Sequence, residues 1–211
     1  MTIRRTALAA VACGALALTA CGSDDDAEAS QEAAGETARE SSEPEHEQVE
    51  NQYPLGEEAI SGGVSLIVED VEESQDASIY ASGYKQGTQP DEVITAPEGA
   101  KFVTVHTTVT NNSRSSWDLT CGSSFSVELL NMEGQFSAPD DEQYRIHGNP
   151  ECNDSLNPGL SSPMAWRFVV PEEAEPLALS FQDYDLDYSE EPSFAVLAEG
   201  QELGRFSEPP Q

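Results

Sequence analysis

The chain has 211 residues, of which 40 are acidic and 9 are basic, so its net charge is −31 at neutral pH. This charge excludes nucleic acid and anionic surfaces as direct partners, because their negative groups would be repelled. We expect salt to screen the self-repulsion, so the melting temperature of the domain should rise between low and molar salt.

The first 20 residues have the pattern of an export signal. Arg4 and Arg5 stand before an apolar run of about 12 residues, Ala7 to Leu18. A bilayer span requires about 20 apolar residues, so this run predicts a removable signal peptide and no membrane helix. The general secretory route is favoured over twin-arginine export, which stays open, because Ile3 stands where Ser or Thr is preferred.

The signal ends in Leu18-Thr19-Ala20-Cys21, which resembles the lipobox of bacterial lipoproteins. The resemblance implies that Cys21 becomes the mature N-terminus and carries lipid on its sulfur. Each buried methylene contributes about 0.8 kcal/mol, so two or three acyl chains would anchor the protein to the outer face of the bacterial cell membrane. The alternative is an ordinary secretory signal with a chance cysteine.

An acidic stretch follows the cysteine. Residues 22–58 include 13 acidic residues and one basic residue, Arg39, and they are almost free of apolar side chains. Such a stretch buries too little surface to fold alone. The sequence therefore predicts a signal peptide at 1–20, a lipidated cysteine and disordered tether at 21–54, and a folded domain at 55–211.

The domain shows short alternating apolar runs and no helical periodicity. The spacing of three between Val68 and Val71 predicts a bulge near Glu69-Asp70. About seven strands with one apolar face each predict an antiparallel β-sandwich. The residues that mark the expected apolar faces are Val64, Leu66, Val68, Val103, Val105, Thr107, Val109, Phe125, Val127, Leu129, Trp166, Phe168, Val170, Leu177, Leu179, Phe181, Phe194 and Val196.

Three segments carry a family resemblance: PLGEEAISGGVSLIVEDVEES, GAKFVTVHTTVTNNS and LNPGLSSPMAWRFVVPEEAEPLALSF. They resemble an uncharacterised family, named only as a domain of unknown function, that is common in Gram-positive lipoproteins. The family is similar to the secreted mycobacterial immunoprotective extracellular antigens. The resemblance covers about Leu55 to Val196 and implies an immunoglobulin-like fold at the cell surface, with no catalytic residues to transfer. The insertion from Ser74 to Thr95 departs from it.

Two cysteines remain in the domain, Cys121 and Cys152. In an exported protein we expect them to form a disulfide, which closes a loop of about 30 residues and contributes about 3 to 4 kcal/mol in the chain-entropy model. The alternative is a metal site of both cysteines with His147 and His106, although no paired ligand spacing supports it.

Three alternating aspartates, Asp183, Asp185 and Asp187, are the best candidates for a metal site. If their strand continues, their carboxylates share one face and could bind Ca²⁺. The alternative is an exposed acidic face opposite three inward-facing side chains, Tyr184, Leu186 and Tyr188.

No catalytic motif is present, so we expect a binding or scaffolding role at the envelope and no enzyme activity. The partner would be an envelope protein or a glycan. The insertion from Ser74 to Thr95 is the best candidate for a recognition loop, because its Tyr80, Tyr84 and glycines suit a contact surface. A flexible excursion between strands is the alternative. A hydrolase would require a pocket joining His106 or His147 to a nucleophile.

Overall fold

The computed structural model describes residues 51–81, 90–122, 124–184, 191–201 and 203. The chain divides into two units, Met1–Glu45 and His46–Gln211, and every described residue belongs to the second. The predicted signal peptide, Cys21 and most of the tether lie outside the described residues. Within the described part, no helix has the length and hydropathy needed to cross a membrane.

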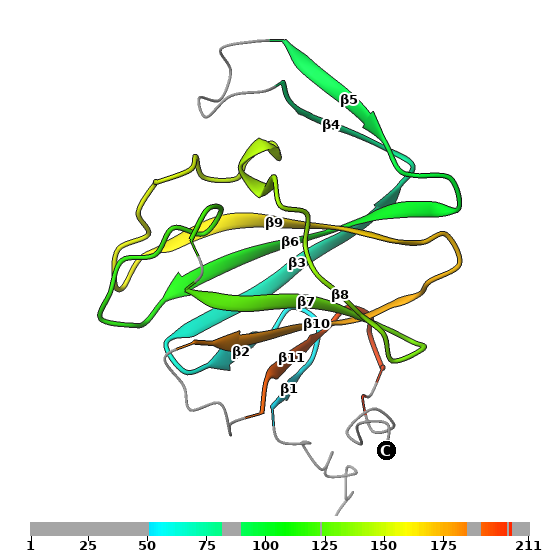
Figure 1. Cartoon of the computed structure of the whole chain (residues 1–211). Helices are drawn as coiled ribbons and strands as arrows, with labels where there is room; N and C mark the ends of the chain where they lie inside the picture. Colours follow the sequence, from blue (N-terminus) through cyan, green and yellow to red (C-terminus); the bar gives the residue numbers. More distant parts are fainter. Residues whose placement is uncertain (1–50, 82–89, 123, 185–190, 202, 204–211) are drawn as a thin grey trace, which may run out of the picture. The chain divides into compact units, whose positions relative to one another are not determined.

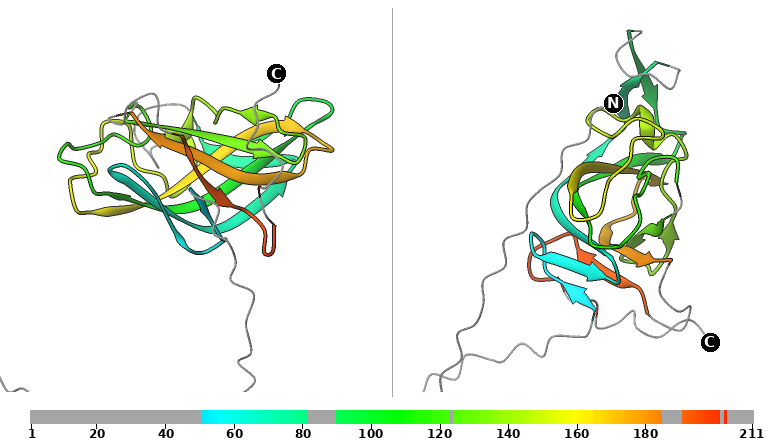
Figure 2. Two further views of the ribbon diagram at one scale, coloured as in Figure 1. Left: turned by 90° about the horizontal axis from the view of Figure 1, so that it is seen from below. Right: turned by 90° about the vertical axis from the view of Figure 1, so that its left-hand side faces the viewer.

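Two sheets face each other in this unit (Figures 1 and 2). The first has the order β1-β11-β10-β7-β8, and the second has the order β2-β3-β6-β9. Neighbouring strands are antiparallel except for the parallel pair of β1 and β11. The bounds are β1 (Gln52–Tyr53), β2 (Glu58–Ser61), β3 (Val64–Ser74), β4 (Asp76–Tyr80), β5 (Asp91–Thr95), β6 (Ala100–Asn111), β7 (Phe125–Asn131), β8 (Phe136–Ser137), the short 3-10 helix η1 (Gln143–Arg145), β9 (Ser161–Pro171), β10 (Pro176–Asp183) and β11 (Ser193–Val196). The predicted antiparallel β-sandwich is confirmed, and Gln52 and Tyr53, which the sequence placed in the tether, form its first strand.

Alternation positions the central strands. In β6 the valines and Thr107 are buried in the core, while Thr104, His106 and Thr108 on the other face are half-buried. A slip of one residue would turn the apolar face of the strand toward solvent. Because burial contributes roughly 25 cal/mol per Å² of apolar area, this pattern fixes the register of the strand. The predicted bulge is also confirmed, because the pairing of β3 with β6 shifts register between Val68 and Asp70.

The expected apolar face of β11 is wrong. Ala195 and Leu197 belong to the main core, whereas Val196 lies in a smaller second cluster with Phe194 packed against it. Leu203 covers the outer face of this strand in that cluster, so both faces of β11 are apolar. A strand that is buried on both sides carries no alternation that could identify its inner face.

The chain crosses from one sheet to the other after β8. Ser137 still pairs with β7, but Pro139 bridges to Phe168 of β9, and the Asp140 amide donates to the Arg167 carbonyl at 2.7 Å. We call residues 138–149 the crossing segment. It continues along the outer edge of β9, where it contributes to the burial of Arg167 on the face opposite Trp166.

Candidate functional site: a clamped hairpin beside an acidic cleft

The insertion forms a β-hairpin. Strands β4 and β5 pair from Asp76 with Thr95 to Tyr80 with Asp91, and the Ala96 amide closes the base by donating to the Gln75 carbonyl at 2.8 Å. The described part of the insertion is therefore a pair of hydrogen-bonded strands. Residues 82–89, which include Tyr84, lie outside the described residues. Figure 2 shows the two strands projecting beyond the sheets of the sandwich.

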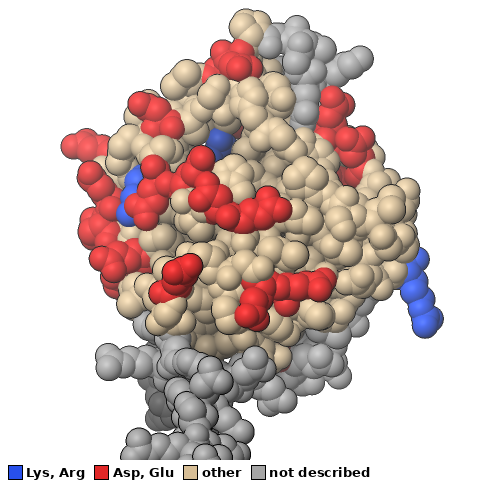
Figure 3. All heavy atoms as spheres, turned by 180° about the vertical axis from the view of Figure 1, so that it is seen from behind, with Lys and Arg blue, Asp and Glu red and all other residues tan. Residues whose placement is uncertain are grey.

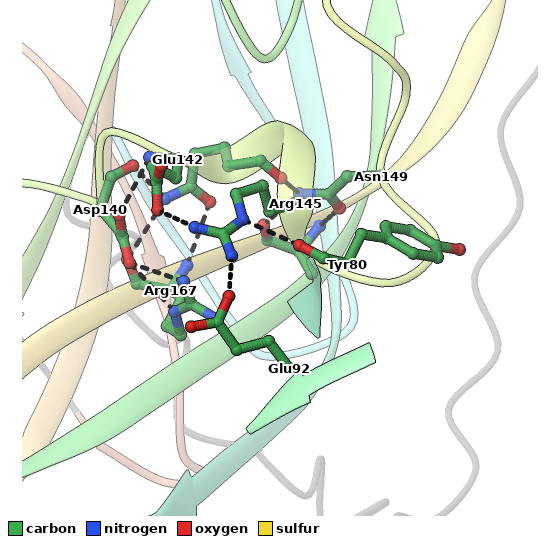
Figure 4. Close-up of polar contacts among 9 residues, drawn as sticks. Tyr80, Glu92, Asp140, Glu142, Arg145, Asn149 and Arg167 are labelled. Carbon is green, nitrogen blue, oxygen red and sulfur yellow. Dashed lines mark hydrogen bonds and ion pairs between the residues drawn. The ribbon is translucent and has the colours of Figure 1, made fainter. Parts of the chain in front are cut away.

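Arg145 of η1 holds the hairpin near Tyr80 and Glu92, at the end farthest from its base (Figure 4). Its Nε donates to the Tyr80 carbonyl at 2.8 Å, and its two terminal nitrogens lie 2.6 Å from the carboxylates of Glu92 and Glu142. Burial alone would lower the pKa of Arg145, but hydrogen bonds and charge attraction from Glu142 and Glu92 raise it overall. We call these four residues the Arg145 clamp.

Apolar and aromatic contacts support the clamp. Ile79 is buried and bridges to Ile146, the residue after η1. The ring of Tyr80 lies 4.2 Å from the ring of His147, centroid to centroid, and His147 Nε2 lies 3.6 Å from a carboxylate oxygen of Asp91. The hairpin is therefore packed against the crossing segment as well as tied to it by charge.

The crossing segment is itself anchored by a buried ion pair. Arg167 is 2% exposed, and its guanidinium donates to Asp140 at 2.6 and 3.2 Å. The same guanidinium lies 5.3 Å from the centre of the Phe102 ring, within reach of a cation–π interaction. Asp140 thereby connects the buried Arg167 to the crossing segment, which also contains Arg145 (Figure 4).

Two side-chain amides complete the outer edge of β9. Asn149 accepts from the Ala165 amide at 2.6 Å and donates to the Ala165 carbonyl at 2.8 Å. Gln143 makes the same pair of contacts with the backbone of Arg167, at 3.3 and 3.4 Å. These side chains supply the hydrogen bonds that a neighbouring strand would otherwise supply.

A cleft of about 500 Å³ opens on the other side of the crossing segment. Phe125 and Trp166 form part of its wall, with ring centres 5.9 Å apart, and Trp117 packs behind Phe125 at 5.5 Å without lining the cleft. The lining residues are Asp118, Leu119, Thr120, Cys121, Gly122, Ser124, Phe125, Val127, Ala138, Pro139, Asp140, Asp141, Gln143 and Trp166. These include three carboxylates and no basic side chain.

A disulfide and a carboxylate secure the rim of the cleft. Cys121 and Cys152 are bonded, with their Cα atoms 5.4 Å apart. Asp118 accepts from the amides of Cys121 and Thr120 at 2.9 and 3.1 Å and from the Asn153 amide at 2.8 Å. Burial would raise the pKa of Asp118, but these hydrogen bonds outweigh it and hold the pKa below its ordinary value.

The alternative metal site at the cysteines does not assemble as expected. Within the described residues, the metal-type donors that gather there are Asp118, Cys121 and Cys152, without either histidine. Both sulfurs belong to the disulfide. His147 instead faces Tyr80 and Asp91, and His106 Nε2 lies 3.6 Å from Glu72.

Asp183 has a structural role. Its carboxylate accepts from the Gly63 amide at 2.6 Å, and its own amide donates to the Ser61 hydroxyl at 3.3 Å, so it joins β10 to the turn between β2 and β3. Asp183 is 3% exposed and Tyr184 is 50% exposed, which reverses the expectation of outward aspartates and inward tyrosines at this pair. Asp185 and Asp187 lie outside the described residues.

The histidines named for a hydrolase lie on the second sheet and on the crossing segment. Neither lines the cleft, and across the described part of the chain neither hydrogen-bonds to a serine. Each has a carboxylate within 3.6 Å. The exposed acids of β2 and β3 (Glu58, Glu69, Asp70, Glu72 and Glu73) lie on the sheet that contains His106, and Figure 3 shows how widely acidic side chains spread over this side of the molecule.

Sequence reasoning missed the clamp and its anchor. One available signal was Arg167, a charge inside the apolar run Met164 to Val170, because a buried charge requires a partner. Nothing in the sequence identified that partner as Asp140, 27 positions earlier.

The search of curated proteins finds no match. Among solved structures, an uncharacterised β-sandwich protein from Clostridium difficile is 14% identical with a TM-score of 0.45, over 70% of this chain and 94% of that one. A conserved hypothetical protein from Bacillus anthracis is 12% identical with a TM-score of 0.42, over 67% and 94%. A protein described as a candidate lipoprotein of Bacillus subtilis is 14% identical with a TM-score of 0.39, over 66% and 38%.

A family profile matches the folded part of the chain. The profile is that of the domain of unknown function DUF4352, and it covers residues 53–193. This span runs from the last residue of β1 to the first residue of β11, so it contains β2 to β10, including the hairpin and the crossing segment. The chain therefore belongs to the DUF4352 family.

Proposed function

We propose that this chain is a lipid-anchored protein at the outer face of the bacterial cell membrane, and that it binds an envelope partner through its β4–β5 hairpin without catalysis. The lipobox at Cys21 supports the anchor. The Arg145 clamp is the observation that carries the binding role, because it fixes an element that the sandwich does not need for its own core.

A clamped hairpin suits recognition for an energetic reason. Ordering the backbone of one residue costs about 1 to 2 kcal/mol, so an insertion that is already ordered loses less entropy when it binds. Within the described residues β5 pairs only with β4, so its outer edge can accept a strand from a partner. Val93, in the middle of β5, is 69% exposed and offers an apolar contact there.

Crosslinking in intact cells tests the role of the hairpin. The full-length, lipidated protein would be crosslinked and its partners identified by mass spectrometry. In the variant, residues 76–95 are replaced by a Gly-Ser pair that joins Gln75 to Ala96, which the structure already places in hydrogen-bond contact. We expect one dominant envelope partner that is lost in the variant.

The control is Lys101→Gln, which removes the surface ion pair between Lys101 of β6 and Glu73 of β3 and leaves the hairpin in place. It should retain the partner. An identical set of crosslinked proteins with and without the hairpin would overturn the binding proposal. The anchor is tested separately: Cys21→Ser should release the protein into the medium, and retention of this variant in the membrane would contradict lipidation at Cys21.

A further inference from the structure

The cleft beside the crossing segment has the size of a small-molecule site. Its volume of about 500 Å³ lies within the roughly 300 to 1,000 Å³ typical of ligand pockets. Such pockets combine an apolar or aromatic wall with a few polar groups that set orientation. Here Phe125 and Trp166 supply the aromatic part, and the three aspartates supply the polar part.

The charged residues of the cleft favour a ligand of positive charge. Asp118, Asp140 and Asp141 line it, and no Lys or Arg does. Acidic groups in a cleft with low-dielectric walls concentrate their potential inside it and attract cations. The large negative charge of the chain adds to this attraction and disfavours any anion.

The three carboxylates differ in availability. Asp140 is paired with the buried Arg167, and Asp118 accepts hydrogen bonds from three backbone amides. Asp141 is exposed, and no hydrogen bond or ion pair joins it to the other described residues. A metal ion would require several free oxygen ligands. One available carboxylate in a cleft that Phe125 and Trp166 also line instead suits a single organic charge.

We propose that the cleft binds a small organic cation, an amine or quaternary ammonium carried on a carbon skeleton. The cationic group lies near Asp141, and the skeleton packs against Phe125 and the apolar wall. This site is separate from the hairpin, so the proposal does not depend on the proposed envelope partner.

A fluorescence titration tests the site directly. The chain has two tryptophans: Trp166 lines the cleft, and Trp117 contacts Phe125, which also lines it, so tryptophan emission reports on occupancy. The probe is benzyltrimethylammonium, added to the full-length protein in a neutral detergent. We expect saturable binding with a Kd on the order of 1 mM, given the small number of atoms in the probe. Benzyl alcohol and benzoate should bind at least tenfold more weakly.

Two variants locate the charge. Asp141→Asn should weaken binding of the probe several-fold, because it removes the available carboxylate. Glu133→Gln, a matched control at an exposed acid that does not line the cleft, should bind as the unmodified chain does. Excising residues 76–95 should leave the titration unchanged. No saturation, equal binding of benzyl alcohol, or equal loss in Asp141→Asn and Glu133→Gln would overturn the proposal.

Discussion

Two regions flank the crossing segment and hold their loops in different ways. At the cleft rim, a disulfide between Cys121 and Cys152 and the Asp118 carboxylate secure the backbone directly. At the hairpin, Arg145 holds a carbonyl and two carboxylates, with apolar contacts beneath. The first region is held by a covalent bond and backbone amides, and the second is held mainly by charge.

The difference determines what loosens each region. A disulfide is insensitive to salt, and a carboxylate bonded to backbone amides is sensitive to acid. Ion pairs with half-exposed partners weaken in salt but persist across the neutral pH range. The hairpin is therefore the region that can open while the sandwich remains folded, as expected of elements near the low-stability end of a structure.

The largest effect should come from the pair beneath the clamp. Asp140→Ala would leave the Arg167 guanidinium buried without a partner, which typically costs about 3 to 5 kcal/mol of unfolding free energy. Urea denaturation measures the loss. Arg167→Met combined with Asp140→Ala should recover most of it, because no buried charge remains. If Asp140→Ala cost less than about 1 kcal/mol, the pair would not anchor the crossing segment.

Removing the disulfide should have the next largest effect. Cys121→Ser with Cys152→Ser should lower the unfolding free energy by about 3 to 4 kcal/mol, since it frees a loop whose ends are 31 positions apart. Asp118 still joins Cys121 to Asn153, so the two loops should keep their native amide protection in this variant. Adding Asp118→Ala should abolish that protection. Loss of protection from the disulfide alone would show that Asp118 does not hold the loops.

Arg145→Gln should cost only about 1 kcal/mol globally, because Glu92 and Glu142 are half-exposed. Its local effect should be larger. Amide hydrogen exchange in β4 and β5 should accelerate at least tenfold, while exchange in β6 and β9 stays slow. Lys101→Gln serves as the control and should leave β4 and β5 unchanged. Uniform acceleration across the sandwich would mean that the hairpin is not a separate unit.

Acid should act on the cleft rim through the Asp118 carboxyl. The folded pKa of Asp118 lies below its unfolded value of about 3.8, so its stabilisation is complete above that pH and is lost as the pH falls through the folded pKa. Below pH 4 the unmodified chain should lose stability faster than Asp118→Asn does. Thermal melts between pH 5 and pH 2.5 measure this slope. If the melting temperatures of the two proteins fell equally with pH, Asp118 would not be the group that stabilises the cleft rim.

Salt should loosen the hairpin and leave the cleft rim in place, whereas acid acts on the cleft rim. Between low and molar salt, the melting temperature should rise by a few degrees because screening relieves self-repulsion of the acidic surface. Amide exchange in β4 and β5 should meanwhile accelerate, since the Arg145 ion pairs are screened too. A fall in melting temperature would show that attractive charge pairs dominate over repulsion.

Much of the sandwich followed from the sequence because its pattern is physically simple. In β6 the alternation of Val105 and Val109 with the half-buried His106 and Thr108 identifies one buried face, and the structure retains it. The bulge near Asp70 followed from a slip in the same pattern. In β11 both faces are apolar, so the pattern could not choose between Phe194 and Ala195.

The site could not be predicted in the same way because long-range polar pairs create it. Arg145 contacts Tyr80 across 65 positions and Glu92 across 53, and Asn149 contacts Ala165 across 16. Periodicity is a local property, and it carries no information about which distant carboxylate an arginine meets. Asp183 illustrates the same limit, because a buried contact with Gly63 removed it from the acidic face that alternation suggested.

The amides of Gln143 and Asn149 along β9 have a consequence for crowded conditions. An open sheet edge can recruit a strand from another molecule and start aggregation. In this protein the edge positions at Ala165 and Arg167 are already occupied by side chains of the same chain. Copies concentrated in one plane could therefore sit closely without joining along this edge, whereas β5 keeps an outer edge that pairs with no other described strand.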